Sequence, residues 1–385
     1  MSRLSQLEER MDAVTTAGTP IPAQRYDFPD EDVETITRQL SELLRSRAFL
    51  TMGERCAEFE RRFASFAGVP HAVAVSSGTA ALEIILRAVG VEGGEVVVPT
   101  NTFAATAFAV LHAGAVPVFA DCGEDLAVDP ADVERRITPA TRAVIAVHIG
   151  GLVSGGMRRL RELCRSRRLA LVEDAAHACG SALDGSAAGS LGDAAAFSFF
   201  PTKVMTTGEG GMVTTADERI ATTTRLLRDQ AKVRGRNLHE AVGSNWRLTE
   251  LQAIVGLTQL ARVPEFIAAR ERVARVYDRA FAGDPLVRPV AVPAGSCPNW
   301  YKYLLLTEDE GAAIAARLAP ERAVALGGTV YDVPCHQQPV FARFARGPLP
   351  VAEHLCRHHL CPPIYPSLTE DEAWRAADAV LEAAR

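Results

Sequence analysis

Residues 171–215 read LVEDAAHACGSALDGSAAGSLGDAAAFSFFPTKVMTTGEGGMVTT. The stretch opens with an apolar run typical of a strand, which ends on Glu173 and Asp174. A second such run, at 195–200, leads to Lys203 in a loop rich in threonine and glycine. The order therefore places one carboxylate and one lysine just past the ends of two predicted strands.

This pair of residues is what pyridoxal phosphate chemistry requires. The lysine amine must form a Schiff base with the cofactor aldehyde, and the carboxylate must face the pyridine nitrogen and keep it protonated as an electron sink. Taken singly, Lys203 is explained as well by a solvated loop lysine, and Asp174 by a helix N-cap. Their order, with Ser198 ahead of the lysine as a hydroxyl for the phosphate, favours a cofactor site.

Composition sets the broad class of the protein. The 385 residues exceed one core of usual size, so we expect one large and one smaller domain. The net charge of −6, with Lys and Arg scattered, gives no electrostatic footprint for nucleic acid or for an anionic membrane. No stretch approaches the roughly 20 apolar residues that cross a bilayer, and the N-terminus lacks the apolar core of a signal peptide. We expect a cytoplasmic protein.

Between residues 71 and 174, short apolar runs alternate with helical patterns. Because these runs are apolar throughout, they predict a mainly parallel sheet covered by helices on both faces. Ligands bind beyond the carboxyl ends of such strands, where the polar residues of this chain accumulate. The predicted strands are AVAVSS, EVVVP, VPVFAD, AVIAVH and LALVED, and the predicted helices lie at 79–90, 104–112, 130–137 and 157–168.

The flanking regions complete the predicted organisation. Helical spacing predicts helices at 30–47 and at 54–67, the second ended by Gly68. We expect an N-terminal extension at 1–29 without an assignable role, a large cofactor-binding domain at 30–262, and a connecting helix with a small α+β domain at 263–385. Later elements are predicted as helices at 218–230, 248–260, 263–281 and 311–318, strands at 299–306 (NWYKYLLL) and 329–333, and a closing helix from Thr369.

The cysteines and histidines do not favour a metal site. Helical spacing would place His354, His358 and Cys361 of EHLCRHHLC on one face, so a metal site is conceivable. The segment lacks a paired CxxC, however, and a helix entering the turn at 361–363 is preferred. We expect no metal, and we expect reduced thiols at Cys56, Cys122, Cys164, Cys179, Cys297, Cys335, Cys356 and Cys361.

Two weaker patterns concern the cofactor. The turn SSGTA at 76–80 lies between a predicted strand and a helix, where small residues leave backbone N–H groups free to hold a phosphate. Phe103 follows VVVP at a strand end and could stack on a flat ring, although a core phenylalanine is the commoner explanation. Alone, neither pattern is specific.

Five motifs together resemble one family. SSGTAAL, VVVPTNTF, VEDAAHACG, SFFPTKVMTTGEGG and SNWRLTELQA closely resemble the DegT/DnrJ/EryC1/StrS aminotransferases, from about Asp30 to the C-terminus. Members of this family use pyridoxal phosphate to aminate keto-sugars on nucleotide carriers and some carbocyclic ketones. The resemblance implies an α/β architecture of the fold type I aminotransferase kind, and a homodimer with active sites at the subunit interface.

The resemblance also implies roles for individual residues. Lys203 becomes the Schiff-base lysine, Asp174 the partner of the pyridine nitrogen and Phe103 the stacking ring. His177 falls beside the ring hydroxyl, where some relatives carry glutamine, and histidine there is similar to the 4-amino-sugar branch. The expected phosphate contacts are Gly78, Thr79 and Ser198, with Asn245 reaching from the other subunit. His336 and Tyr365 are plausible substrate contacts, though packing within the small domain explains them as well.

The expected reaction is transfer of an amino group from glutamate or glutamine to a keto-sugar, with a keto-cyclitol or other carbocyclic ketone as the alternative acceptor. A dehydratase branch of the family replaces the lysine with histidine, so Lys203 favours transamination over deoxygenation. A regulatory protein without catalysis would be expected to lack Lys203 or Asp174. A P-loop or dinucleotide enzyme would need GxxxxGK[ST] or GxGxxG after a strand, and neither pattern occurs.

Overall fold

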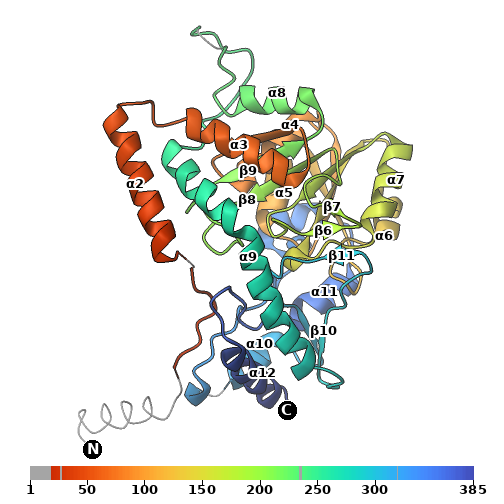
Figure 1. The fold of residues 1–385 in the computed structure, drawn as a ribbon. Coiled ribbons are helices and arrows are strands. Elements are labelled where there is room, and N and C mark those ends of the chain that lie inside the picture. The colour runs from red at the N-terminus through yellow and green to blue at the C-terminus, as the bar shows by residue number, and fades with distance from the viewer. Residues whose placement is uncertain (1–18, 27, 234–235, 319) are drawn as a thin grey trace, which may run out of the picture.

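The centre of the fold is a seven-stranded sheet in the upper part of the molecule in Figure 1. The computed structural model describes residues 19–26, 28–233, 236–318 and 320–385. Strand order across the sheet is β1-β9-β8-β5-β4-β2-β3. The strands are β1 (His71–Val75), β2 (Glu95–Pro99), β3 (Val116–Ala120), β4 (Thr141–Val147), β5 (Ala170–Asp174), β8 (Ala194–Ser198) and β9 (Gly211–Thr215).

The predicted mainly parallel sheet is confirmed. The neighbours β8, β5, β4, β2 and β3 pair in parallel, whereas β9 is antiparallel to both of its neighbours, β8 and β1. The sequence analysis did not predict β9, although it lies within the motif that carries Lys203. Because β9 returns directly from β8, the loop between these two strands opens at the carboxyl end of β8, and Lys203 lies in that loop.

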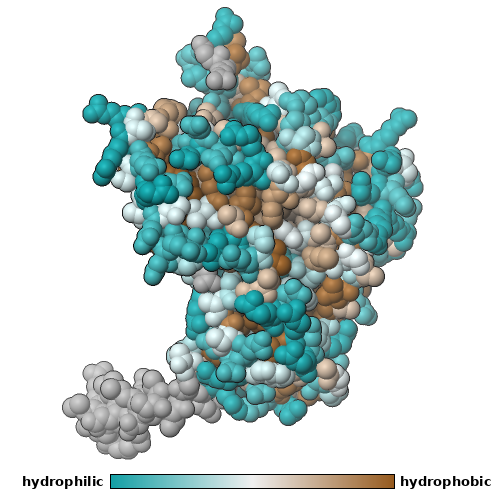
Figure 2. Space-filling model, viewed as in Figure 1, coloured by the Kyte–Doolittle hydropathy of each residue, from teal (hydrophilic) through white to brown (hydrophobic). Residues whose placement is uncertain are grey.

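Helices cover both faces of this sheet, as its apolar strands predict. One face packs against α4 (Gly78–Ala88), α5 (Ala104–His112) and α8 (Glu218–Leu227), and the other against α3 (Glu54–Ala67), α7 (Met157–Arg167) and α9 (Glu250–Ala280). Figure 1 shows α3 and α9 in front of the sheet. Figure 2 shows hydrophilic residues over most of this face of the molecule, with hydrophobic residues gathered in patches between them.

Most predicted helices appear within a few residues of their expected bounds. Helix α2 (Asp30–Ser46) precedes α3, and α3 ends at Gly68 in the left-handed conformation (φ 67°), as predicted. Helix α6 (Pro130–Arg136) is capped by Asp129, whose carboxylate accepts hydrogen bonds from the first-turn backbone. These bounds follow from local signals, namely apolar spacing and capping residues.

The prediction of two helices at 248–260 and 263–281 is wrong, because the structure has one helix, α9, across both. Pro264 lies inside it and removes one backbone hydrogen bond, at a cost of about 3 kcal/mol. Val263 and Phe266 on either side are buried in the core beneath the large sheet. Burial on both sides of Pro264 offsets the local cost, and the domain boundary predicted at 262–263 falls within this helix.

The C-terminal part forms a second, smaller core. The strands β10 (Val287–Pro289), β12 (Leu305–Thr307) and β13 (His359–Leu360) form one sheet of this part. The strand β11 (Ser296–Cys297) instead pairs with the hairpin of β6 (Ala182–Leu183) and β7 (Ser186–Ala187), which lies between β5 and β8 in the chain. Helices α10 (Gly311–Arg317), α11 (Pro350–Arg357) and α12 (Glu370–Ala384) belong to this part. Ile21 of the N-terminal extension is buried here and pairs with Val324, so the described end of the extension packs on the smaller core.

Of the two strands predicted in this part, the one at 299–306 is too long and the one at 329–333 is wrong. NWYKYLLL is a strand only from Leu305, because Trp300 has a left-handed backbone (φ 55°) and the Lys302 N–H donates to the Gly150 carbonyl. No strand forms in residues 329–333, of which 329–331 line a cavity instead. The hydrogen bond of Lys302 to Gly150, and in the second segment the packing of Tyr331 on Phe103 and His177, take the place of a sheet ladder.

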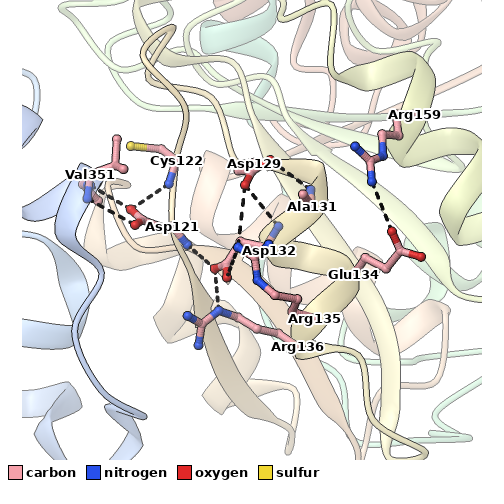
Figure 3. A network of polar contacts seen from close by, with 11 residues as sticks. Asp121, Cys122, Asp129, Ala131, Asp132, Glu134, Arg135, Arg136, Arg159 and Val351 are labelled. Carbon is pink, nitrogen blue, oxygen red and sulfur yellow. Dashed lines mark hydrogen bonds and ion pairs between the residues drawn. The ribbon is translucent and has the colours of Figure 1, made fainter.

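Asp121 joins the two parts near the end of β3 (Figure 3). Its carboxylate accepts hydrogen bonds from the backbone N–H groups of Val351 (3.2 Å) and Ala352 (2.7 Å) in the first turn of α11. The Asp121 N–H donates to the Asp132 carboxylate (2.7 Å), which also binds Arg136. The network therefore fixes the position of α11 against the large sheet.

The segment at 353–361, whose histidines and cysteine made a metal site conceivable, divides between α11 and β13. Helix α11 ends at Arg357, so Cys361 does not share its helical face with His354 and His358. The His359 ring is held by the Leu355 carbonyl and the Val330 N–H. Across the described ranges, no three His, Cys, Asp or Glu residues are arranged to hold a metal ion. All eight cysteines are free thiols.

Among the helices that the structure describes, none combines the length and apolar character needed to cross a membrane. The predicted cytoplasmic location stays a prediction.

Candidate active site

A cavity of about 420 Å³ lies beyond the carboxyl ends of β5 and β8, where the sequence predicted a ligand site. Its size is within the range of small-molecule and cofactor sites. Both parts of the chain contribute to its walls. The lining residues are Ser77, Gly78, Thr79, Leu82, Phe103, Ala105, Thr106, Val147, Asp174, Ala176, His177, Ser198, Phe200, Thr202, Lys203, Glu209, Tyr301, Lys302, Gly327, Thr329, Val330 and Tyr331.

Asp174 ends β5 and presents a buried carboxylate to the cavity. One oxygen accepts a hydrogen bond from the Thr106 hydroxyl (2.8 Å), and the other accepts one from the Ala176 N–H (3.2 Å). Burial raises the pKa of Asp174, and these two donors and the nearby Lys203 charge lower it. A cation placed in the cavity would compensate this carboxylate further.

Lys203 lies in the loop after β8 and points into the same cavity. Burial lowers the pKa of its amine to about 8, although the Asp174 charge acts in the opposite direction. The Nζ atom lies 4.9 Å from the centre of the Tyr301 ring. About a tenth of the amine is therefore neutral at pH 7, far more than for a lysine with an ordinary pKa, and a lysine nucleophile needs this neutral form.

The turn from β1 to α4 forms a cradle of backbone N–H groups. Ser77 caps α4 by accepting from the Ala80 N–H (3.1 Å), and the N–H groups of Gly78 and Thr79 begin the helix without intrahelical acceptors. A Cβ atom on Gly78 would lie 2.9 Å from the Cβ of Ser198, so only glycine allows this approach. The hydroxyl of Ser198 and the helix N-terminus thus face one space suited to an anion.

Aromatic rings form another wall of the cavity. Phe103 is 63% exposed, and its ring stacks on Tyr331 with centroids 6.4 Å apart. The Tyr331 ring stacks in turn with His177 (6.3 Å), and His177 packs on Tyr301 (4.4 Å). Burial raises the pKa of Tyr331 well above its usual range, so its hydroxyl remains protonated. Flat surfaces of this kind suit a planar ligand.

His177 is neutral in this environment. Burial and the charges of Lys203 and Lys302 lower its pKa well below the usual range. The Gly150 N–H donates to Nδ1 at 3.4 Å, so the ring proton resides on Nε2. The ring can therefore donate a hydrogen bond from Nε2 without carrying a charge.

A buried hydrogen-bonded pair, Glu173 and His148, supports the end of β5 next to Asp174. Both oxygens of the fully buried Glu173 are hydrogen-bonded, one of them to His148 Nε2 at 2.9 Å. The other acceptor positions are filled by the N–H groups of Gly189, Leu191 and Gly192. The His148 N–H donates to the Asp174 carbonyl. These bonds fix the strand end that orients Asp174, and the sequence analysis gave Glu173 no such role.

Comparison with known proteins identifies the family. A model of the DegT/DnrJ/EryC1/StrS aminotransferase family matches residues 30–381. The chain belongs to this family. The resemblance seen in the sequence motifs is confirmed, and the protein is an aminotransferase of the pyridoxal-phosphate-dependent class.

Individual relatives cover nearly the whole aminotransferase. It is 38% identical to GDP-perosamine synthase of Caulobacter vibrioides over 339 residues. The alignment covers 86% of this chain and 91% of that protein. The structure of DesV from S. venezuelae in complex with a ketimine intermediate superposes with a TM-score of 0.89 and 35% identity, covering 96% of this chain and 99% of DesV. The PLP form of Spr1654 from Streptococcus pneumoniae superposes with a TM-score of 0.87 and 25% identity, covering 95% of this chain and 99% of Spr1654. These neighbours confirm the fold type I architecture.

Three predicted site residues lie outside the cavity of this aminotransferase chain. Asn245 is exposed on the segment after α8 and does not line the cavity. His336 is buried between Thr100, whose hydroxyl lies 2.7 Å from Nδ1, and Glu353, 3.0 Å from Nε2. Tyr365 is fully buried in the smaller core. The substrate contacts predicted for His336 and Tyr365 gain no support from this geometry and stay predictions.

Several cavity residues of the aminotransferase were not predicted as site residues. Thr106 lies one helical turn after Thr102, and this spacing after a strand end was a usable signal. Tyr301, Lys302 and Tyr331 come from segments predicted as strands of the small domain. No local pattern marks them, because they reach the site only through packing of the two parts of the chain.

Proposed function

We propose that this aminotransferase binds pyridoxal 5′-phosphate and transfers an amino group from glutamate or glutamine to a keto-sugar carried on a nucleotide. The observation that carries the proposal is the pair of Lys203, with its pKa lowered to about 8, and the buried Asp174 in one cavity. Relatives such as the GDP-perosamine synthase named above favour a nucleotide-linked sugar over a keto-cyclitol.

The cavity residues fit the proposed cofactor in three respects. The cradle of Ser77, Gly78, Thr79 and Ser198 suits a phosphate, because it combines a helix N-terminus with hydroxyl groups and excludes a Cβ atom. The buried Asp174 carboxylate calls for a cationic partner such as a protonated pyridine nitrogen. The exposed face of Phe103 offers a stacking surface.

Each residue would then act through one physical effect. When bound, pyridoxal phosphate supplies the electron sink for the carbanion that forms on the donor. Asp174 keeps a proton on the ring nitrogen, and His177 donates from Nε2 toward the ring hydroxyl. The neutral Lys203 Nζ accepts the proton that leaves the donor α-carbon and later returns it. The aromatic wall at Phe103 and Tyr331 excludes water from this exchange.

The acceptor can be identified by experiment. The purified protein is first converted with L-glutamate to its amino-loaded form, and a set of keto-sugar nucleotides and keto-cyclitols is then screened for return of the original cofactor absorbance. Rapid return with a nucleotide-linked keto-sugar alone is the expected result. Return only with a keto-cyclitol would replace the proposed acceptor, and no response to any ketone would contradict amino transfer to such acceptors.

The lowered pKa of Lys203 predicts how cofactor attachment depends on pH. Only the neutral amine attacks an aldehyde, and with a pKa of about 8 this form is lost as pH falls through that value. The initial rate at which cofactor-free protein takes up pyridoxal phosphate is expected to rise roughly tenfold from pH 7 to pH 9. Stopped-flow absorbance measures this rate. A rise centred near pH 10.5, the value of an unperturbed lysine, would contradict the assignment.

We further propose a homodimer in which each active site takes one residue from the partner. Large exposed hydrophobic side chains occur at Leu44, Phe49 and Leu50, and again in the loop at Leu238 and Val242. The first segment lies beside residues 248–250, which follow Asn245 closely, because the Leu50 carbonyl accepts from the Glu250 N–H and the Thr51 hydroxyl donates to the Leu248 carbonyl. Exposed apolar surface of this kind supports a protein interface. Asn245 would reach the partner's phosphate cradle.

Mixing two inactive variants tests the shared site. If Asn245 serves the partner's cavity, Lys203→Ala and Asn245→Ala homodimers are each impaired at both sites. A heterodimer of the two has one site with both changes and one site with neither, so transaminase activity is expected to reappear on mixing. Differently tagged chains verify the exchange. A flat rate despite proven heterodimers would show that Asn245 serves its own chain or neither site.

A further inference from the structure

The segment that closes the cavity from the C-terminal part is held rigidly at residues 299–302. The buried Arg270 of α9 donates to the carbonyls of Trp300 (3.2 Å) and Ile364 (2.7 Å). The Asn299 side chain donates to the carbonyls of His177 (2.8 Å) and Cys179 (2.9 Å). With the left-handed backbone at Trp300, these bonds fix the direction in which the next two side chains point.

Those two side chains, Tyr301 and Lys302, both enter the cavity. The Tyr301 hydroxyl lies 3.2 Å from that of Thr202, which places the ring beside Lys203. The Lys302 ammonium lies 5.7 Å from the centre of the same ring, against 4.9 Å for Lys203. The two ammonium groups therefore lie no further apart than the sum of these distances, with the Tyr301 ring in contact with both.

Lys302 has no anionic partner within the part of the chain that the structure describes. Its Nζ donates one hydrogen bond, to the Gly327 carbonyl at 3.0 Å, and no carboxylate there forms an ion pair with it. An ammonium has three N–H donors, so two remain for a ligand. A half-buried cation without a counter-ion is costly unless a ligand supplies one.

The placement of lysine in the sequence makes this cation unusual. The chain has 41 Lys and Arg residues, of which only Lys203, Lys232 and Lys302 are lysines. Two of the three lysines lie in this one cavity, and Lys232 is exposed on the segment after α8. Positive charge outside the cavity is thus supplied almost entirely by arginine, whereas the two cationic side chains in the cavity are lysines, whose ammonium groups are compact and flexible.

We infer that Lys302 binds the α-carboxylate of the amino donor. The inference rests on the proposed function, because it requires that the donor amine takes the place of the Lys203 amine. The donor carboxylate is attached to the same carbon as that amine, so it must lie close to Lys203. Among the described residues that line the cavity, Lys302 is the one other lysine or arginine. A nucleotide diphosphate is separated from the reacting ketone by a sugar ring. The phosphate cradle at 77–79 contacts Ser198 instead of Lys302.

The test uses the loaded enzyme and the variant Lys302→Met, which removes the charge and keeps the length of the side chain. The first half-reaction is followed with L-glutamate and with L-glutamine, which share the α-carboxylate and differ at the other end. The half-saturating concentration of both donors is expected to rise about 10- to 100-fold. Lys302→Arg is expected to recover part of this loss, and the second half-reaction with the keto-sugar nucleotide should be unchanged.

Binding of glutarate, measured by calorimetry, gives a readout without turnover. Glutarate carries carboxylates but no amine, so Lys302→Met is expected to weaken its binding by a similar factor. Lys232→Met is the matched control, since it removes the one lysine outside the cavity and should change neither measurement. If wild-type enzyme converts neither donor, the proposed function fails, and the glutarate measurement still decides whether Lys302 binds a carboxylate.

Three results would overturn the inference. Unchanged donor saturation and glutarate binding in Lys302→Met would show that the ammonium serves only to hold Gly327. A rise in half-saturating concentration that is confined to the keto-sugar nucleotide would show that Lys302 binds the diphosphate instead. An equal loss in every measurement, together with a lower thermal midpoint, would show a structural role.

Discussion

Replacing Lys203 by alanine is expected to abolish transamination and covalent attachment of the cofactor. Without Nζ there is no amine to bind the aldehyde, and nothing in the cavity takes the proton from the donor α-carbon at the same place. Loss of a positioned nucleophile and proton carrier predicts a fall in rate of at least about 10³-fold. Mass spectrometry after borohydride reduction measures the attachment, and a coupled assay measures the rate.

The fold of this variant should persist. Burial lowers the pKa of Lys203 more than the Asp174 charge raises it, so the charged amine is on balance destabilising at neutral pH, and its removal should not unfold the chain. Circular dichroism and the thermal midpoint should match those of Lys232→Ala, the control at the exposed lysine. A Lys203→Ala protein that borohydride still links to the cofactor would refute the assignment of this lysine.

Asp174→Asn is expected to bind the cofactor and to lose most of its rate. The amide keeps a group of the same shape beside the Thr106 hydroxyl, so the pocket should remain intact. It cannot hold the ring nitrogen protonated, and loss of a charge-assisted interaction of about 1.5–3 kcal/mol corresponds to roughly 10- to 150-fold in rate. Single-turnover absorbance with the amino donor measures this step.

The same variant has a second signature in the titration of Lys203. The Asp174 charge raises the pKa of Lys203 against burial, so its removal should move the pH midpoint of cofactor uptake below 8. Asp184→Asn, in an exposed ion pair with Arg158, is the control and should leave both rate and midpoint unchanged. Full activity of Asp174→Asn, or an unmoved midpoint, would refute the role of this carboxylate.

The sequence alone predicted the parts of the fold that local physical chemistry decides. Apolar runs and capping residues placed the parallel strands β2, β3, β4, β5 and β8 and the helices around them, because periodicity and caps act within a few residues. Since ligands gather at the carboxyl ends of parallel strands, the positions of Asp174 and Lys203 after such strands also predicted that they would meet. The structure places both in one cavity.

Only the tertiary structure decided the other wall of the site and the long helix. Tyr301, Lys302 and Tyr331 lie in segments whose apolar pattern predicts strands. Instead, the Lys302 N–H bonds to the distant Gly150 carbonyl, and the Tyr331 ring packs on Phe103 and His177. Helix α9 continues through Pro264 because both sides of it are buried. These outcomes depend on which partners packing brings within hydrogen-bond distance, and that free energy is absent from any local stretch of sequence.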